Sequence, residues 1–302
     1  MSRASAASPD NHGCGLADHF EPERTGWHGD RAWLYRAGQL EVVVLPQRGG
    51  KLASIIHYGR QWLTQPKCPL LPMSQLPELL VDGDMFGWDE CAPTIDDCDV
   101  LGHRLPLHGD AWDQPWVDAG DGWLEVRGRS LAYTLRRRLS VRPDGFRLDY
   151  RVIAEQRMPF LWAAHPQFAA APDTQVVFGS DGLPLVDSFE RGYWSDRGAD
   201  DPVRLADVPP EHSAKLFVAP EQAVDRAQLL HPDGATLTLR WDPEVVPYLG
   251  VWMDRAGIGP VDTIAIEPMT GYADSCAAAA RANRVLRLNP MQTVSWWLDV
   301  SL

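Results

Sequence analysis

A hairpin pattern that recurs along the chain constrains the fold more than any other feature of the sequence. Within residues 131–154, Leu131, Tyr133 and Leu135 alternate with other residues, the turn sequence RPDG follows, and the alternation then resumes. A second hairpin pattern surrounds another Pro-Asp-Gly turn at residues 232–234. Alternation of this kind is typical of antiparallel strands that bury one face.

Further runs rich in β-branched and aromatic residues predict more strands, at residues 40–46, 51–59, 214–219, 247–253, 262–268 and 293–300. Helical periodicity is scarce, and the best helix candidate is a short alanine-rich stretch at 274–282, capped by Asp274 or Ser275. Many short strands joined by Pro/Gly turns indicate an all-β, largely antiparallel sandwich or barrel with few short helices.

No repeat, low-complexity linker or charge block divides the 302 residues. We therefore predict one domain over 1–302, with residues 1–30 as an N-terminal extension of irregular structure. The segments 66–77 and 196–211 are predicted to be loops or lids.

The composition excludes some partner classes. A net charge of −13 would repel nucleic acid, and we interpret the one dense basic run, Arg136 to Arg138, as a solvated strand face with neighbouring carboxylates. No apolar stretch is long enough to span a membrane, and no secretory signal is visible. With five sparse cysteines, we expect a cytoplasmic protein with reduced thiols.

Three polar residues stand where a strand is predicted to end. His165 closes the apolar run LWAAHPQF, Glu267 follows the buried-type run TIAI, and His108 precedes Gly109. Each has a structural interpretation: a core histidine, a paired edge carboxylate and a turn histidine. Glu267 fits that interpretation least well, because a carboxylate in an apolar run is either paired or placed for proton transfer.

Taken together, these motifs resemble the aldose 1-epimerase, or galactose mutarotase-like, family. His108-Gly109, His165 in AAHPQF and Glu267 in AIEP occur in the family's order. Residues 46–63 resemble the family's opening strands, and the ending RLNPMQTVSWWLDV resembles its closing hairpin. The resemblance spans about residues 40 to 302 and implies a galactose mutarotase-like β-supersandwich with a sugar cleft on one face.

The resemblance also implies a reaction. A glutamate removes the proton of the anomeric hydroxyl, a histidine protonates the ring oxygen, and the opened sugar recloses as the other anomer. By position, Glu267 would be the base, His165 the acid and His108 the second histidine. A carboxylate and an imidazole can supply this chemistry at neutral pH, so no cofactor or metal is expected.

The candidate substrate-binding residues lie beside these motifs or on nearby strands, and tryptophan faces among them could stack on a sugar ring. They are Trp88, Asp89, Glu90, Trp112, Gln167, Trp252 and Asp254. We expect Lys215 to be a solvated strand lysine rather than part of the site.

The sequence departs from the family pattern at Gln167-Phe168 and at Pro268-Met269, and Asp110 to Asp113 contain no arginine for a sugar phosphate. An unphosphorylated monosaccharide or sugar derivative is therefore the expected partner, and homodimer formation stays open. Two other functions stay open as well. The protein could be a non-catalytic sugar-binding sensor, or a metal-dependent sugar isomerase or hydrolase that uses the same His/His/Glu cluster.

Overall fold

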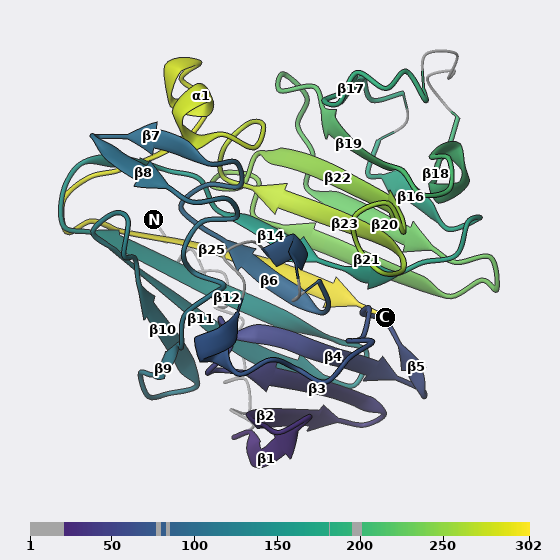
Figure 1. Ribbon diagram of the computed structural model, residues 1–302, viewed down its shortest axis with the longest axis horizontal. Coiled ribbons are helices and arrows are strands. Elements are labelled where there is room, and N and C mark those ends of the chain that lie inside the picture. Colours follow the sequence, from purple (N-terminus) through teal and green to yellow (C-terminus); the bar gives the residue numbers. More distant parts are fainter. Residues whose placement is uncertain (1–20, 77–79, 83–84, 181, 195–200) are drawn as a thin grey trace, which may run out of the picture.

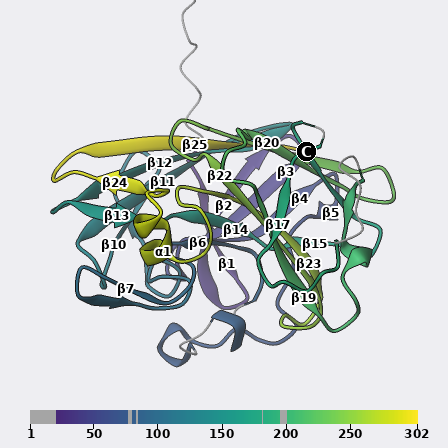
Figure 2. The same cartoon turned by 90° about the horizontal axis from the view of Figure 1, so that it is seen from above.

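The computed structural model describes residues 21–76, 80–82, 85–180, 182–194 and 201–302. Within them, the chain forms two large sheets that pack face to face (Figures 1 and 2), and the all-β fold predicted from the sequence is confirmed. Every strand pair in this part of the chain is antiparallel; an isolated bridge between Ala92 and Gly109 is parallel.

The larger sheet, here the first sheet, has 12 strands in the described residues. They are β1 (Glu23–Trp27), β2 (Asp30–Ala37), β3 (Leu40–Leu45), β4 (Lys51–His57), β5 (Arg60–Gln61), β6 (Trp88–Cys91), β14 (Ala163–Pro166), β15 (Phe168–Ala169), β17 (Leu185–Asp187), β19 (Ser213–Val218), β22 (Tyr248–Arg255) and β23 (Asp262–Met269). Its central order is β4-β6-β14-β23-β22-β19, so segments far apart in the sequence become neighbours.

The second sheet has nine strands in the described residues. They are β9 (Val117–Asp118), β10 (Trp123–Arg127), β11 (Tyr133–Arg142), β12 (Gly145–Ala154), β16 (Gln175–Phe178), β18 (Val203–Arg204), β20 (Arg226–Leu230), β21 (Thr236–Trp241) and β25 (Thr293–Ser301). The two hairpins predicted around Pro-Asp-Gly turns are β11–β12 and β20–β21, with the expected antiparallel register.

Smaller elements complete the described structure. Two two-stranded sheets pair β7 (Cys98–Val100) with β8 (His103–Leu105) and β13 (Met158–Phe160) with β24 (Leu286–Leu288). The helix α1 (Cys276–Arg281) forms where predicted, and the hydroxyl of Ser275 accepts a hydrogen bond from the Ala278 amide. Three 3-10 turns are η1 (Met73–Gln75), η2 (Leu80–Asp82) and η3 (Leu205–Asp207).

The predicted irregular segments differ in outcome. Residues 1–20 of the expected N-terminal extension, residue 77 of the first predicted loop and residues 196–200 of the second lie outside the described residues. The described end of the extension forms the edge strand β1 instead of irregular chain. The described parts of the segment after β5, residues 64–76, 80–82 and 85–87, cross the outer face of the first sheet, on the side away from the second sheet, as the blue segment in Figure 2 shows.

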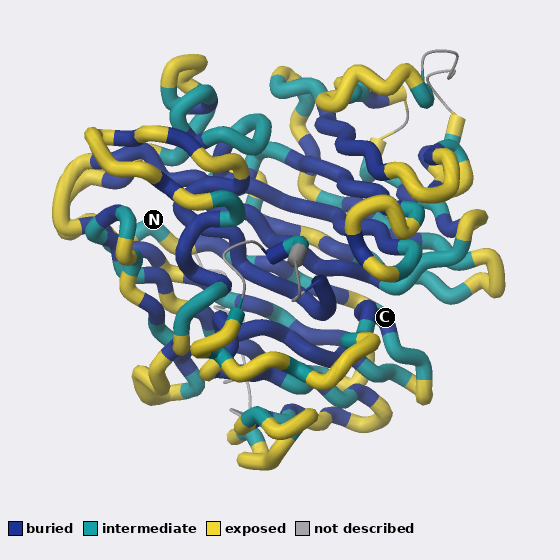
Figure 3. Tube along the Cα trace, in the orientation of Figure 1, coloured by how far each residue is buried: buried dark blue, intermediate teal, exposed yellow. Residues whose placement is uncertain are grey.

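The core lies between the two sheets, where the strand centres are buried and the connecting loops are exposed (Figure 3). It contains charge as well as apolar side chains. The fully buried Glu90 carboxylate accepts hydrogen bonds from Arg137 Nη1 at 2.7 Å, Trp162 Nε1 at 2.8 Å and Tyr150 Oη at 2.9 Å. Burial raises the pKa of Glu90, and the guanidinium of Arg137 acts in the opposite direction.

Arg137 corrects the expectation of a solvated basic run. Side chains alternate along β11, so Arg136 and Arg138 point to solvent and pair with Glu125 and Asp149 as expected. Arg137 shares the inner face of β11 with Leu135 and Leu139 and is buried.

None of the helices in the described part of the chain has the length and apolar content needed to cross a membrane.

The Glu90–Arg137 pair generates a stability prediction. Glu90→Leu leaves the Arg137 guanidinium buried without its carboxylate, which costs about 3–5 kcal/mol in the free energy of unfolding. The double variant Glu90→Leu/Arg137→Met removes the orphaned charge and recovers part of that loss. Urea unfolding of both variants measures the difference, and equal stability of the single and double variants would contradict a charge-based origin.

Candidate active site

The register of four central strands brings the predicted polar residues to one face of the first sheet. His165 on β14 lies opposite Asp89 on β6, and Ala163 pairs with Met269 on β23. Side chains two residues apart share a face, so Glu267 lies on the same side of the sheet as His165. This is the outer face, directed away from the second sheet.

The predicted base and acid lie close together there. His165 Nε2 is 3.8 Å from Glu267 Oε1, and the His108 ring centroid is 5.7 Å from that of His165 in an edge-to-face arrangement. The structure therefore brings His108, His165 and Glu267 to one place, although they come from three separate parts of the sequence.

Two further charged residues complete this group. Lys215 Nζ on β19 lies 2.5 Å from Glu267 Oε2 and 3.3 Å from Asp274 Oδ1, in the loop after β23. We call His108, His165, Lys215, Glu267 and Asp274 the polar cluster.

The sequence places neither Lys215 nor Asp274 in the site. The expectation of a solvated Lys215 is wrong, since the exposed fraction of this residue is 4%. A signal was available, because Lys215 interrupts the apolar run AKLFVA just as Glu267 ends TIAI. For Asp274, the sequence predicts only a role as a cap of the short helix. Its side chain instead contacts Lys215, and Ser275 caps the helix.

The position of His108 is fixed by an unusual backbone and a dense hydrogen-bond network. His108 and Gly109 both have positive φ, 62° and 73°. A Cβ on Gly109 would lie 2.0 Å from the carbonyl oxygen of Ala92, so only glycine fits. This explains His108-Gly109 as a structural unit: the glycine allows the close approach that presents the histidine.

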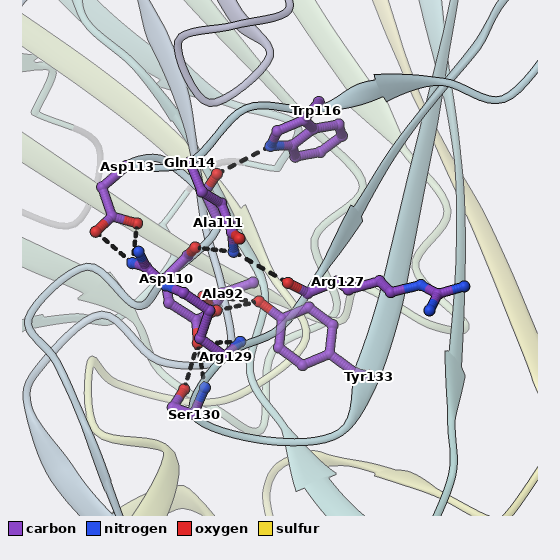
Figure 4. Close-up of polar contacts among 10 residues, drawn as sticks. All are labelled: Ala92, Asp110, Ala111, Asp113, Gln114, Trp116, Arg127, Arg129, Ser130 and Tyr133. Atoms are coloured by element: carbon purple, nitrogen blue, oxygen red, sulfur yellow. Dashed lines mark hydrogen bonds and ion pairs between the residues drawn. The ribbon is translucent and has the colours of Figure 1, made fainter. Parts of the chain in front are cut away.

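The residue after this pair anchors the loop (Figure 4). Asp110 accepts hydrogen bonds from the amides of Arg129 and Ser130, from the Ser130 hydroxyl at 2.6 Å and from Tyr133 Oη at 2.6 Å. Asp113 adds an ion pair with Arg129. Asp110 and Asp113 thus tie the loop that carries His108 to residues 129–133, between β10 and the start of β11. Their side chains are engaged there and do not face a ligand.

The histidines are held neutral by their surroundings. Burial, together with the ammonium groups of Lys215 and Lys51, lowers the pKa of His165 to about 3. Burial, together with His165 and Lys215, also lowers the pKa of His108 to about 3. Both imidazoles are therefore uncharged at neutral pH, with one N–H and one free lone pair each.

The pKa values of the two carboxylates in the polar cluster are raised, whereas those of the histidines are lowered. Burial raises the pKa of Glu267, while Lys215 stabilises its ionised form. Burial likewise raises the pKa of Asp274, and Lys215 again opposes it. Burial lowers the pKa of Lys215, but the Asp274 and Glu267 carboxylates that flank it more than offset this, so its pKa is raised and its ammonium keeps its proton.

An apolar group covers one side of the cluster. Trp252 lies opposite Ala265 on β23 and 5.9 Å from the His165 ring, and it packs with Trp112. The lining residues Leu80 and Met85 belong to the segment that crosses the outer face. Trp112 and Trp252 are thus adjacent to the cluster, as a sugar-stacking role requires.

The other predicted substrate contacts are placed differently. Trp88 and Glu90 point into the core, where Trp88 packs against Phe146 and Phe168, so we leave both out of the candidate site. Asp89 shares the outer face with His165 and is paired with Lys51 at 2.6 Å.

Gln167 and Asp254 both make hydrogen bonds to neighbouring backbone. Gln167 Nε2 donates to the Phe86 carbonyl. Asp254 accepts bonds from the amides of Gly257, Ile258 and Gly259, which organises the turn between β22 and β23. Asp254 is therefore a turn-stabilising residue beside the site.

Several buried polar atoms of the site lack a hydrogen-bond partner among the described residues. They are Glu267 Oε1, His165 Nδ1, His108 Nδ1, Trp112 Nε1 and Asp274 Oδ1, the last of which has only its ion pair with Lys215. Buried polar groups are almost always satisfied in folded proteins, so a group of orphaned atoms in one place calls for a bound partner. Within the described residues, no three His, Cys, Asp or Glu side chains are arranged to hold a metal ion.

Comparison with known proteins identifies the fold. No family model matches the sequence, and no curated protein matches it. A protein from Synechocystis sp. PCC 6803 is similar in structure, with 18% identity and a TM-score of 0.68 over 93% of this chain and 97% of that one. A galactose mutarotase-like protein from Lactobacillus casei ATCC 334 has 16% identity and a TM-score of 0.63, over 89% and 99%.

An aldose epimerase homologue from C. elegans has 11% identity and a TM-score of 0.62, over 89% of this chain and 98% of that one. At these identities the likeness establishes the fold. The galactose mutarotase-like fold expected from the sequence is confirmed.

The depressed pKa of His165 predicts acid sensitivity. Its folded pKa of about 3 lies below the ordinary 6.5, so between pH 6.5 and 3 the unfolded chain binds a proton that the folded protein does not. Stability is therefore lost as pH falls, by about 2 kcal/mol from this residue between pH 7 and 5. Urea unfolding at both pH values should show a smaller loss in His165→Gln, and equal losses in the two proteins would contradict it.

Proposed function

We propose that this protein is an aldose 1-epimerase that interconverts the α and β anomers of an unphosphorylated sugar. The observation that supports it most is the convergence of Glu267 Oε1, His165 and His108, with unpartnered polar atoms, on one buried face. A hemiacetal supplies what these atoms lack: a hydroxyl proton for the carboxylate and oxygens for the imidazoles. Trp112 and Trp252 provide apolar ring faces beside them.

The proposed reaction moves one proton from O1 of the sugar to the ring oxygen O5. Glu267 Oε1 takes the O1 proton while the O–H electron pair forms the C1=O bond. The C1–O5 bond breaks, and its electron pair stays on O5, which accepts a proton from His165. Rotation about C1–C2 and the reverse sequence then give the other anomer.

His165 is neutral at rest, so it must gain the proton that it donates. The 3.8 Å separation of His165 Nε2 and Glu267 Oε1 supports a relay in which the proton removed by Glu267 passes to His165 and then to O5. The raised pKa of Glu267 favours removal of the O1 proton, and the lowered pKa of His165 favours release of a proton to O5. The same two shifts make the transfer from Glu267 to His165 the uphill step of the relay. His108, 5.7 Å from His165, would orient the ring or the O1 atom.

The charges of the site favour a neutral sugar. Lys51 is paired with Asp89, and Lys215 is paired with Glu267 and Asp274. With the histidines uncharged, the carboxylates outnumber the ammonium groups among these residues. A phosphate or carboxylate substituent would therefore meet net negative charge.

Loss of either reacting group should remove most of the rate enhancement. Glu267→Gln and His165→Gln are each expected to lower the catalysed rate of anomer interconversion about 100- to 10,000-fold, as for other positioned proton transfers. Polarimetry or NMR exchange spectroscopy measures the rate above the uncatalysed background. His103→Gln, at an exposed position on β8, is the matched control that should keep full activity.

The same experiment separates the other candidate functions. Unchanged rates in both site variants would overturn the epimerase assignment. Saturable sugar binding with no rate enhancement would indicate a sensor, and stoichiometric metal in the purified protein would indicate a metal enzyme.

Substrate charge gives a second expected outcome. Glucose 6-phosphate should show a kcat/KM at least about tenfold below that of glucose, equivalent to about 1.4 kcal/mol. Added salt should narrow the difference by screening the repulsion. NMR measurement with both sugars tests this, and equal kcat/KM values at low salt would contradict a neutral-sugar site.

A further inference from the structure

The Lys215 side chain must cross a neighbouring strand to reach Glu267. Lys215 belongs to β19 and Glu267 to β23, and β22 lies between these two strands. The residue opposite Glu267 on β22 is Gly250. A Cβ at this position would lie 3.2 Å from Lys215 Cε, so the lysine side chain passes directly over the glycine.

Gly250 lies within a strand and is not among the positive-φ glycines, so its backbone conformation does not require glycine. Glycine in a strand interior weakens the strand and often marks a close approach. At Gly250 two side chains of β19 approach equally closely, the Lys215 side chain on its way to the carboxylate and the Phe217 ring, whose Cε1 also lies 3.2 Å from the position of a Cβ. Because Gly250 has no side chain, the space above it, here called the passage, is open to the Lys215 side chain.

The contacts at the end of this passage are asymmetric. Lys215 Nζ lies 2.5 Å from Glu267 Oε2, while Glu267 Oε1 has no hydrogen-bond partner in the described residues and is directed toward His165. Asp274 holds the same ammonium from the other side at 3.3 Å. One cation is therefore shared between the proposed base and a second buried carboxylate.

Several other titratable groups lie on the elements around Glu267. They are His165 on β14, Asp89 and Cys91 on β6, Lys51 on β4, His108 in the loop after β8, Lys215 on β19 and Asp274 after β23. The histidines are neutral, the Cys91 thiol is buried with a pKa well above its ordinary value, and Lys51 is paired with Asp89. Lys215 is the cation in direct contact with Glu267.

We propose that Lys215 is a positioning residue that fixes Glu267 as an ionised base with Oε1 toward the sugar, and that Asp274 limits how strongly it does so. This inference rests on the proposed function of Glu267. Lys215 occupies Oε2, so only one oxygen remains to accept a proton. Asp274 draws the ammonium away and adds a second negative charge, which keeps Glu267 basic enough to react.

Removal of Lys215 and removal of Asp274 should therefore shift the midpoint of Glu267 ionisation in opposite directions. In Lys215→Met, the midpoint of Glu267 ionisation should rise by at least about one pH unit, since a buried carboxylate loses its cation. In Asp274→Asn, the midpoint should fall, since a nearby like charge is removed. A purely structural role for these residues predicts no such opposite pair of shifts.

The direct measurement is NMR titration of protein labelled with ¹³C at the glutamate carboxyl carbons, with the Glu267 resonance assigned from its loss in Glu267→Gln. The acidic limb of the pH profile of kcat/KM should move with this midpoint. At the wild-type midpoint, a rise of one pH unit lowers the ionised fraction of Glu267 from one half to about one eleventh. Lys215→Met should therefore lose about fivefold in kcat/KM at that pH and recover it at higher pH, after subtraction of the uncatalysed rate.

Two variants serve as matched comparisons. Lys51→Met removes another fully buried ammonium from the same face, one that contacts Asp89, and should leave the Glu267 midpoint within about 0.3 pH units. Gly250→Ala keeps every charge but crowds the passage, so the Glu267 midpoint should rise as in Lys215→Met, by a smaller amount.

The outcomes separate this inference from the proposed function. Retained activity in Glu267→Gln overturns the proposed function. Loss of activity in Glu267→Gln, with an unmoved Glu267 midpoint in Lys215→Met, overturns only the inference. If Lys215→Met does not fold, the inference depends on Asp274→Asn and Gly250→Ala, and absence of the two opposite shifts there overturns it.

Discussion

Paired buried charge is the interaction on which the centre of this molecule depends. An ionised side chain without an opposite charge is too costly to bury, so each one needs a partner at close range. Asp89 and Glu90 are consecutive on β6 and point to opposite faces of the first sheet. Glu90 meets Arg137 in the core, and Asp89 meets Lys51 on the outer face. The first sheet can thus carry charge on both sides while it remains the centre of the fold.

The buried charge pairs on the two faces of the first sheet differ in how many hydrogen-bond donors reach the carboxylate. In the core, both oxygens of Glu90 accept hydrogen bonds from protein donors, Oε1 from Arg137 and Tyr150 and Oε2 from Trp162. On the outer face, Glu267 has one oxygen filled by Lys215 and one open. The difference between a structural carboxylate and a candidate catalytic one is therefore the number of donors that reach it.

The polar cluster also carries a cost in stability. Two neutral imidazoles, an open carboxylate oxygen and a lysine shared by two carboxylates are arrangements that a purely structural core avoids. The surrounding framework maintains them through specific devices. Gly109 permits the backbone approach that presents His108, Asp110 anchors that loop, and Gly250 gives Lys215 its path.

The sequence by itself determined the strands, their hairpins and the short helix, since period-two alternation and turn chemistry act over neighbouring residues. It also singled out His165 and Glu267, because a polar side chain in an apolar run is conspicuous wherever it lies. Alternation alone cannot say which face of a strand meets the core, so Trp88 and Glu90 seemed as suitable for a ligand as Asp89 did. Only the packing of the second sheet decided that. The pairing of Lys215 with Glu267 was likewise decided by tertiary structure, because it depends on the order of β19, β22 and β23 and on the space above Gly250.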